Sequence, residues 1–183
     1  MKSAFDAAPG QDIITGRTVD AQGADSVSTP LPQNRTIDRS VVLAAGNSAS
    51  LFVRRSVFDR IGAFDERFGL GAETEFESSE ELDFLVRALQ ARLGIAYTRD
   101  LTVFHDQVHP GDYEAQVRRT ATYARGFGAM LRKNRFGAAF LMLLTARTLG
   151  GIAVRAVQRR PLLAKQKITQ SRNVVSGYLK WVE

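Results

Sequence analysis

The sequence predicts an α/β domain followed by a basic helical tail, and two observations support this. Up to about residue 110, short β-rich segments alternate with loop and helix patterns, whereas from Asp112 onward the pattern is helical almost throughout. The charge divides at the same place, because residues 1–110 carry 11 basic and 16 acidic side chains and residues 111–183 carry 14 basic and 3 acidic ones. We therefore expect a domain over 1–110 and a tail over 111–183.

Three strands are expected in the first half of the domain. Asp12 to Val19 (DIITGRTV), Val41 to Ala45 (VVLAA) and Ser50 to Val53 (SLFV) are all rich in residues that favour strands. The intervening stretch from Ala21 to Ser40 is rich in Ser, Pro, Asn, Gln and Gly. Such a composition predicts a loop.

Two helices follow. The first is short, running from a Ser56 cap to Arg60, with Gly62 as its stop. The second should run from about Glu80 to about Arg92. Apolar residues at helical spacing give it one buried face: Leu82, Leu85, Val86 and Leu89.

After the second helix, two short strands are expected at Ile95 to Thr98 and Leu101 to Phe104, separated by Arg99-Asp100. The later strand brings His105 to its carboxyl end. In open α/β sheets, ligands gather at the carboxyl ends of strands. His105 is therefore a candidate functional residue, although a single histidine at a strand end can equally have a structural role.

The tail should be helical with interruptions at its glycines and proline: Gly126, Gly128, Gly137, Gly150-Gly151 and Pro161. Its most apolar window, Phe136 to Val157, contains Arg147 near the middle. A central arginine costs roughly 2.5–3.5 kcal/mol on membrane insertion. We therefore expect this helix to lie in a membrane interface or against a partner rather than to span a bilayer.

Composition excludes some classes of site. The chain has no cysteine, so it has no disulfide and no thiolate metal site, which favours a reducing compartment such as the cytoplasm. The first residues, MKSAFDAAPGQ, lack the apolar run of a secretory signal. No nucleic-acid-binding motif accompanies the basic tail, so an anionic membrane surface is the preferred partner over nucleic acid.

Three acids stand at the expected start of the longer helix: Glu80, Glu81 and Asp83. Carboxylates in a first helical turn can simply stabilise the free N–H groups and the helix dipole. Carboxylates near a histidine can instead take a proton from a substrate or hold a divalent cation. The residues alone leave both interpretations open.

Several spaced elements, in one order, carry a family resemblance. They are Gly46-Asn47, Arg54-Arg55, Gly62-Ala63-Phe64-Asp65-Glu66, Glu80-Glu81-Leu82-Asp83 with Arg87, and a strand ending in His105. This order resembles the second half of an inverting family 2 glycosyltransferase of GT-A fold. The resemblance implies a partial GT-A (Rossmann-like) fold followed by the basic helical tail.

The resemblance also implies roles for individual residues. Glu81 matches the base that deprotonates the acceptor hydroxyl, with Asp83 and Glu80 as alternatives. His105 matches a ligand of the divalent metal, Mn²⁺ or Mg²⁺, that binds the sugar diphosphate. Substrate contacts are implied at the remaining matched positions: Asn47, Arg54, Asp65 and Glu66.

The family binds its nucleotide with an N-terminal half and an Asp-x-Asp motif, and no Asp-x-Asp occurs in the 183 residues. We therefore expect the chain to correspond to the acceptor and catalytic-base half, with the nucleotide-binding half missing. The implied partners are a nucleotide-sugar donor and a glycan or lipid-linked acceptor, used in polysaccharide or glycolipid synthesis at the inner face of the cell membrane. The alternative is a non-catalytic relative that binds glycan or protein.

Overall fold

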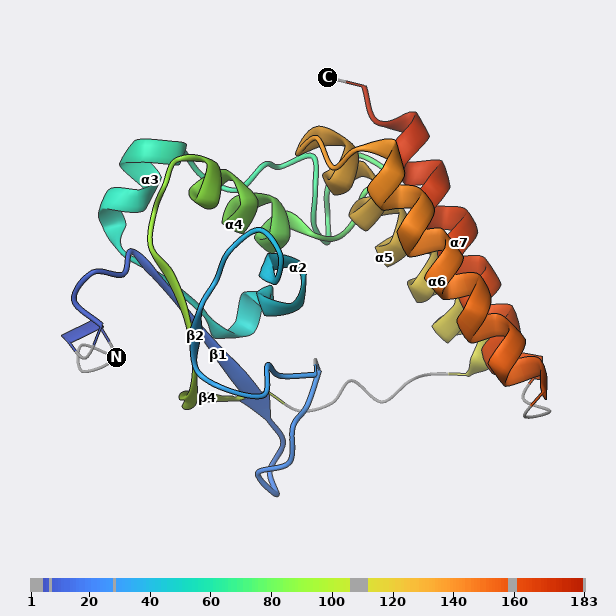
Figure 1. Ribbon diagram of the computed structural model, residues 1–183, viewed down its shortest axis with the longest axis horizontal. Helices are drawn as coiled ribbons and strands as arrows, with labels where there is room; N and C mark the ends of the chain where they lie inside the picture. Colours follow the sequence, from blue (N-terminus) through green and yellow to red (C-terminus); the bar gives the residue numbers. More distant parts are fainter. Residues whose placement is uncertain (1–4, 7, 28, 106–111, 158–160, 183) are drawn as a thin grey trace. The chain divides into compact units, whose positions relative to one another are not determined.

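The structure is a computed structural model that describes residues 5–6, 8–27, 29–105, 112–157 and 161–182. These residues form a mixed α/β protein with a four-stranded sheet and six α-helices (Figure 1). The chain divides into two compact units, Met1–Asp65 with Glu81–His109 and Glu66–Glu80 with Pro110–Glu183. The segment 66–80, expected in the α/β part, is thus grouped with the helical tail.

The sheet of the first unit has the strand order β2-β4-β1-β3. The strand β1 (Ile13–Val19) pairs in parallel with β4 (Ile95–Phe104) and antiparallel with β3 (Leu51–Val53). The short β2 (Arg35–Thr36) pairs antiparallel with β4. Because β1 and β4 run in the same direction, their carboxyl ends lie at one edge of the sheet, where His105 follows β4.

The strand β4 is continuous where two strands were expected. The predicted break at Arg99-Asp100 is instead a shift of register between β1 and β4, located on either side of Gly16. A Cβ atom added to Gly16 would overlap the backbone of Leu101. Glycine therefore allows the irregular part of β4 to approach β1 closely.

The structure corrects the strand expected at Val41 to Ala45, because Val42–Ala45 form a short helix, α2. Its first N–H donates to the carbonyl of Asp38 at 2.9 Å. At its end, the Ala45 carbonyl accepts a hydrogen bond from the Thr15 hydroxyl at 3.1 Å. Val42 and Ala45 are both buried. Tertiary packing has therefore overridden the strand preference of the two valines.

The two helices predicted next are confirmed, but the cap predicted at Ser56 is wrong, because the first helix begins at Arg55 and its N-cap residue is Arg54. Helix α3 (Arg55–Ile61) ends at Gly62, whose φ of 75° suits glycine. Helix α4 (Glu80–Gln90) buries its apolar face as expected. The fully buried core of the first unit includes Ile13, Ile14, Val57, Phe84, Leu85 and Ile95.

The second unit contains α5 (Tyr113–Lys133), α6 (Ala138–Val157), α7 (Pro161–Lys180) and the segment 66–80. The predicted boundaries at Gly137 and Pro161 are confirmed, since α6 starts directly after the glycine and α7 starts at the proline. None of the helices in the described residues is long and apolar enough to cross a membrane.

The other predicted interruptions were wrong. Helix α5 continues through Gly126 and Gly128, and α6 continues through Gly150-Gly151. A Cβ atom at Gly128 would overlap the carbonyl of Val174, and one at Gly177 would overlap the carbonyl of Arg125. These glycines therefore allow α5 and α7 to pack backbone against backbone.

The segment 66–80 packs onto α5 and α7 within the second unit. Phe68 stacks on the single tryptophan, Trp181, with ring centroids 5.0 Å apart. Phe76 lies 5.6 Å from the same ring. The hydroxyl of Ser78 donates to the carbonyl of Tyr123 in α5 at 2.9 Å. Aromatic packing and hydrogen bonds together hold this segment in place.

Glu75 adds an ionic contact that should make the second unit sensitive to acid. Its carboxylate accepts hydrogen bonds from Lys180 and Arg125, both at 3.0 Å, and these partners lower its pKa from 4.5, Lys180 most strongly. Because the folded pKa lies below the unfolded one, the stabilisation is present above pH 4.5 and is lost as the pH falls through the folded pKa.

We expect Glu75→Gln to lower the free energy of unfolding by about 1 kcal/mol at neutral pH, a value limited by screening because the side chain is 34% exposed. The difference from the wild type should vanish in acid. Urea unfolding followed by Trp181 fluorescence measures it, with the exposed Glu73→Gln on the same segment as the control. Equal stability of the two variants at both pH values would contradict the role given to Glu75.

Candidate functional site

The structure places Glu81, the leading candidate for the base, beside the Gly46-Asn47 turn. Glu81 is the second residue of α4 and is half-buried. A Cβ atom added to Gly46 would lie 3.5 Å from the Cγ of Glu81 and would overlap the side chain of Leu82. Two segments that the resemblance matched separately are therefore in contact, and only glycine fits between them.

Asn47 is buried and holds this turn with both ends of its amide. Its carbonyl oxygen accepts a hydrogen bond from the backbone N–H of Ala49 at 3.1 Å, which caps a short 3₁₀ helix, Ser48–Ser50. Its NH₂ group donates to the hydroxyl of Thr18 in β1 at 3.2 Å. The position of Asn47 is therefore fixed relative to the carboxyl end of β1.

A chain of hydrogen bonds continues from Thr18 to His105. The Thr18 hydroxyl donates to the carbonyl of Ser26 at 2.6 Å. The Ser26 hydroxyl in turn donates to the carbonyl of His105 at 2.7 Å. The N–H of His105 donates to the carbonyl of Val19 at 2.9 Å. Asn47 and His105, predicted from distant parts of the sequence, are thus joined through β1.

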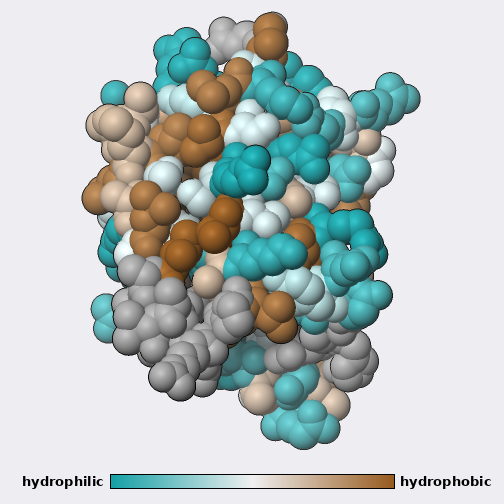
Figure 2. Space-filling view, turned by 90° about the vertical axis from the view of Figure 1, so that its right-hand side faces the viewer, coloured by the Kyte–Doolittle hydropathy of each residue, from teal (hydrophilic) through white to brown (hydrophobic). Residues whose placement is uncertain are grey.

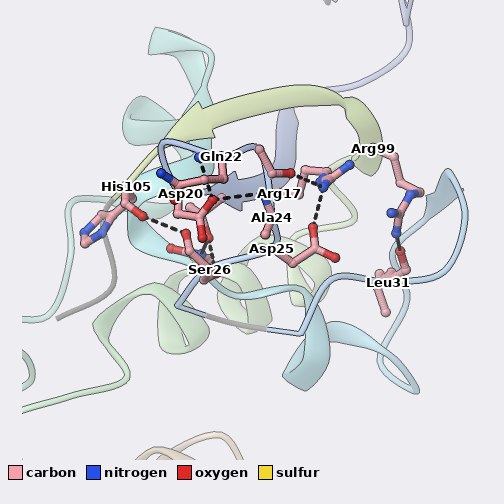
Figure 3. A network of polar contacts seen from close by, with 12 residues as sticks. Arg17, Asp20, Gln22, Ala24, Asp25, Ser26, Leu31, Arg99 and His105 are labelled. Carbon is pink, nitrogen blue, oxygen red and sulfur yellow. Dashed lines mark hydrogen bonds and ion pairs between the residues drawn. The ribbon is translucent and has the colours of Figure 1, made fainter. Parts of the chain in front are cut away.

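These bonds fix the main chain of His105. They use the main-chain N–H and C=O of the histidine, and the half-buried ring points away from the hydrogen-bonded residues (Figure 3). The ring therefore lies at the carboxyl edge of β1 and β4. An imidazole in this place can donate or accept a hydrogen bond or bind a cation.

The turn that carries Ser26 is itself rigid. The carboxylate of Asp20 accepts hydrogen bonds from the N–H groups of Gln22 at 3.0 Å and Ala24 at 2.9 Å (Figure 3). Arg17 forms an ion pair with Asp25 at 2.6 Å. An aspartate that binds backbone N–H groups two and four residues later is typical of a tight turn. The turn thereby holds Ser26 against His105.

Asp83 occupies a different environment from Glu81. Its side chain is 0% exposed, and its carboxylate accepts a hydrogen bond from Arg87 at 2.9 Å. The same guanidinium donates to the carbonyls of Ile61 at 2.5 Å and Ala63 at 2.7 Å. Asp83 therefore joins α4 to the turn after α3, and its contacts point to a structural role.

The acceptor-site candidates Asp65 and Glu66 follow that same turn. Phe64 stacks on Phe84 of α4 with ring centroids 4.6 Å apart, which anchors the turn in the first unit. Asp65 is half-buried and is the last residue of this segment of the first unit. Glu66 is exposed and belongs to the second unit. The structure links Asp65, through its turn, to α4.

Among the described residues, the contacts of Arg54 and Glu80 lie outside the hydrogen-bonded group formed by Asn47, Thr18, Ser26 and His105. Arg54 lies at the amino end of β1, where its guanidinium donates to the carbonyl of Gln11 at 2.8 Å and covers the ring of Phe5. That is the opposite end of the strand from His105. Glu80 belongs to the second unit, with its carboxyl carbon 3.1 Å from the place of a Cβ on Gly69.

The divalent cation that the resemblance implies has His105 as its candidate ligand. Mg²⁺ and related ions are held by several oxygen or nitrogen ligands. In the part of the chain that the structure describes, no three His, Asp or Glu side chains form a group that could hold a metal ion. The imidazole of His105 can supply one nitrogen ligand to such an ion.

Two residues of this hydrogen-bonded group, Thr18 and Ser26, could not be predicted from the sequence. Thr18 has the pattern of an ordinary strand residue, and Ser26 lies in a stretch predicted as loop. Their importance depends on two hydrogen bonds: Thr18 binds Ser26, which is 8 positions away, and Ser26 binds His105, which is 79 positions away. The feature that distinguishes these two residues is a buried hydroxyl near the end of a strand, and burial cannot be seen in a sequence.

No protein-family model matches this chain, and no curated protein is significantly similar to it. A function has therefore to be argued from the residues and their geometry.

Proposed function

We propose that this chain is the acceptor and catalytic-base half of an inverting, nucleotide-sugar-dependent glycosyltransferase of GT-A type. The observation that carries the proposal is the packing of the start of α4, where Glu81 lies, against the Gly46-Asn47 turn, which is hydrogen-bonded through β1 to the main chain of His105. Asn47 and His105 are thus linked at the carboxyl end of β1, and Glu81 lies on the helix that packs on the turn of Asn47. Ligands of open α/β sheets bind at such strand ends.

Glu81 is the proposed base. Its carboxylate takes the proton of a sugar hydroxyl while that oxygen attacks the anomeric carbon of the donor. The bond between the anomeric carbon and the diphosphate breaks, and the diphosphate leaves with the electron pair. A single displacement of this kind inverts the anomeric configuration. Asn47 keeps the neighbouring turn rigid, so the base is held in one position.

Glu81 is preferred to Asp83 because the two carboxylates differ in accessibility. Asp83 is fully buried and bound to Arg87, whereas Glu81 is half-buried at the helix start. A general base must come within hydrogen-bond reach of the hydroxyl that it deprotonates. The proposal further requires a nucleotide-binding half, which the resemblance places before the segment matched here.

The proposal predicts loss of one sugar-transfer activity when the protein is removed from cells that produce it. Membranes from intact and gene-deleted cells are supplied with a panel of radiolabelled nucleotide sugars, and label in the lipid and polymer fractions is counted. We expect incorporation from one donor to disappear and to return with the intact gene. If no donor is affected and the purified chain still binds a glycan array, the protein is a binding module instead.

A further inference from the structure

Helix α6 has an apolar stripe on its outer surface. The stripe follows the spacing of one helical face and comprises Ala139, Met142, Leu143, Ala146, Leu149 and Gly150, all of them exposed. The exposed fractions of its large members are 65% for Met142, 57% for Leu143 and 57% for Leu149. Figure 2 shows hydrophobic side chains gathered in a band on the face of the molecule that it views. Three large apolar side chains exposed on one face of a helix make this face a candidate binding surface.

The three helices of the second unit carry mostly positive charge. Residues 115–182 contain 14 Lys and Arg and no Asp or Glu. Arg147 is exposed on α6 itself, and Lys165 and Arg172 are exposed on α7. Arg132 and Arg135 line a hollow of about 850 Å³ at the start of α6. Whatever covers the stripe must therefore accept both apolar side chains and a dense cationic border.

An apolar stripe bordered by cations fits some classes of partner better than others. A second copy of the chain that paired through the same helices would bring its own cations against these and be repelled. A nucleic acid would satisfy the cations through its phosphates but would leave the leucines without a partner. An anionic lipid surface offers phosphates at its boundary and acyl chains below them, so it complements both features.

We propose that α6 lies flat in the interface of an anionic phospholipid membrane, with the stripe facing the acyl chains. Its 20 residues span about 30 Å along the surface. Arg147 borders the stripe and extends its guanidinium to the lipid phosphates, while its aliphatic part stays in the apolar layer. This attachment does not depend on the proposed sugar transfer.

A fluorescent label tests the orientation of α6 directly. Because the chain has no cysteine, Leu143→Cys provides one site for an environment-sensitive dye, and Asp59→Cys, exposed in the first unit, provides the control site. Vesicles are made of phosphatidylcholine alone or with an equal part of phosphatidylglycerol. We expect a blue shift, and quenching by brominated acyl chains, only for the label at residue 143 and only with the anionic vesicles.

A matched pair of variants tests the contribution of the stripe. Leu149→Glu lies on the stripe, and Leu70→Glu makes the same change at an exposed leucine elsewhere in the second unit. We expect Leu149→Glu to weaken binding to anionic vesicles at least about tenfold more than Leu70→Glu does. Sedimentation of vesicles without any nucleotide sugar gives the affinities, so failure here is separate from failure of the proposed enzyme.

Three results would overturn the proposal. The first is an equal loss for both variants, which would mean that only net charge matters. The second is a label at residue 143 that stays in water on bound vesicles. The third is a label that becomes buried without lipid as the chain dimerises, which light scattering would detect and which would assign the stripe to a second copy.

Discussion

Replacing Glu81 with glutamine is expected to lower sugar transfer about 100-fold or more, because the amide keeps the size of the side chain but cannot accept a proton. General-base catalysis typically contributes about 10²–10⁴-fold to a rate. Glu81 is half-buried at the start of α4, near Gly46, and glutamine fits the same space. The measurement is the transfer from the donor that the intact protein uses, in membranes of cells carrying the variant, with KM for the donor little changed.

Glu80→Gln is the matched control, since it makes the same chemical change one residue earlier. The contact described for Glu80 is with Gly69 of the second unit, so we expect its replacement to alter turnover only severalfold. Equal far-UV circular dichroism of the two variants establishes that both are folded. If Glu80→Gln abolishes transfer while Glu81→Gln retains it, the base has been assigned one position too late.

Local patterns predicted the elements whose stability is local. Helix α4 follows from apolar residues at helical spacing, and α3 ends at Gly62 because a left-handed residue is needed there. The strand β1 follows from its β-branched composition. In each case the pattern within one segment and its tertiary environment favour the same structure, which is when sequence patterns are reliable.

The errors occurred where a distant segment decides the structure. The valines before Ala45 favour a strand, but a hydrogen bond from Thr15 and burial in the core hold this segment as helix. Gly128 was predicted to interrupt a helix, yet it makes room for the backbone of α7, as Gly177 does for the backbone of α5. A sequence does not distinguish a glycine that ends a helix from one that allows two helices to pack closely. Only the packed structure shows which role a glycine has.

In the candidate site, too, some residues could be predicted from the sequence and others could not. Glu81, Asn47 and His105 could be named from the sequence because each lies in a motif, but the bonds that join them pass through Thr18 and Ser26. Those two hydroxyls belong to no motif. The resemblance ranked Glu81 above Asp83, and the burial of Asp83 is an independent physical reason for the same order that the sequence does not show.

Asp83→Ala is expected to have the largest effect on stability, lowering the free energy of unfolding by about 2–3 kcal/mol. Removal of one partner from a buried ion pair typically costs about 3–5 kcal/mol, and the value is reduced here because Arg87 is 21% exposed. The variant leaves Arg87 without its carboxylate and loosens its bonds to Ile61 and Ala63. Urea unfolding followed by circular dichroism measures the change, with the exposed Asp59→Ala on α3 as the control.

The Asp83→Ala variant also distinguishes a structural role of Asp83 from a catalytic one. If Asp83 acts only through Arg87, then Asp83→Ala combined with Arg87→Met should be more stable than Asp83→Ala alone, since no unpaired guanidinium remains. Any loss of sugar transfer in Asp83→Ala should then be recovered in part by the second change. A base cannot be rescued in this way, because removing an arginine supplies no proton acceptor. Full inactivity of the stable double variant would therefore transfer the catalytic role from Glu81 to Asp83.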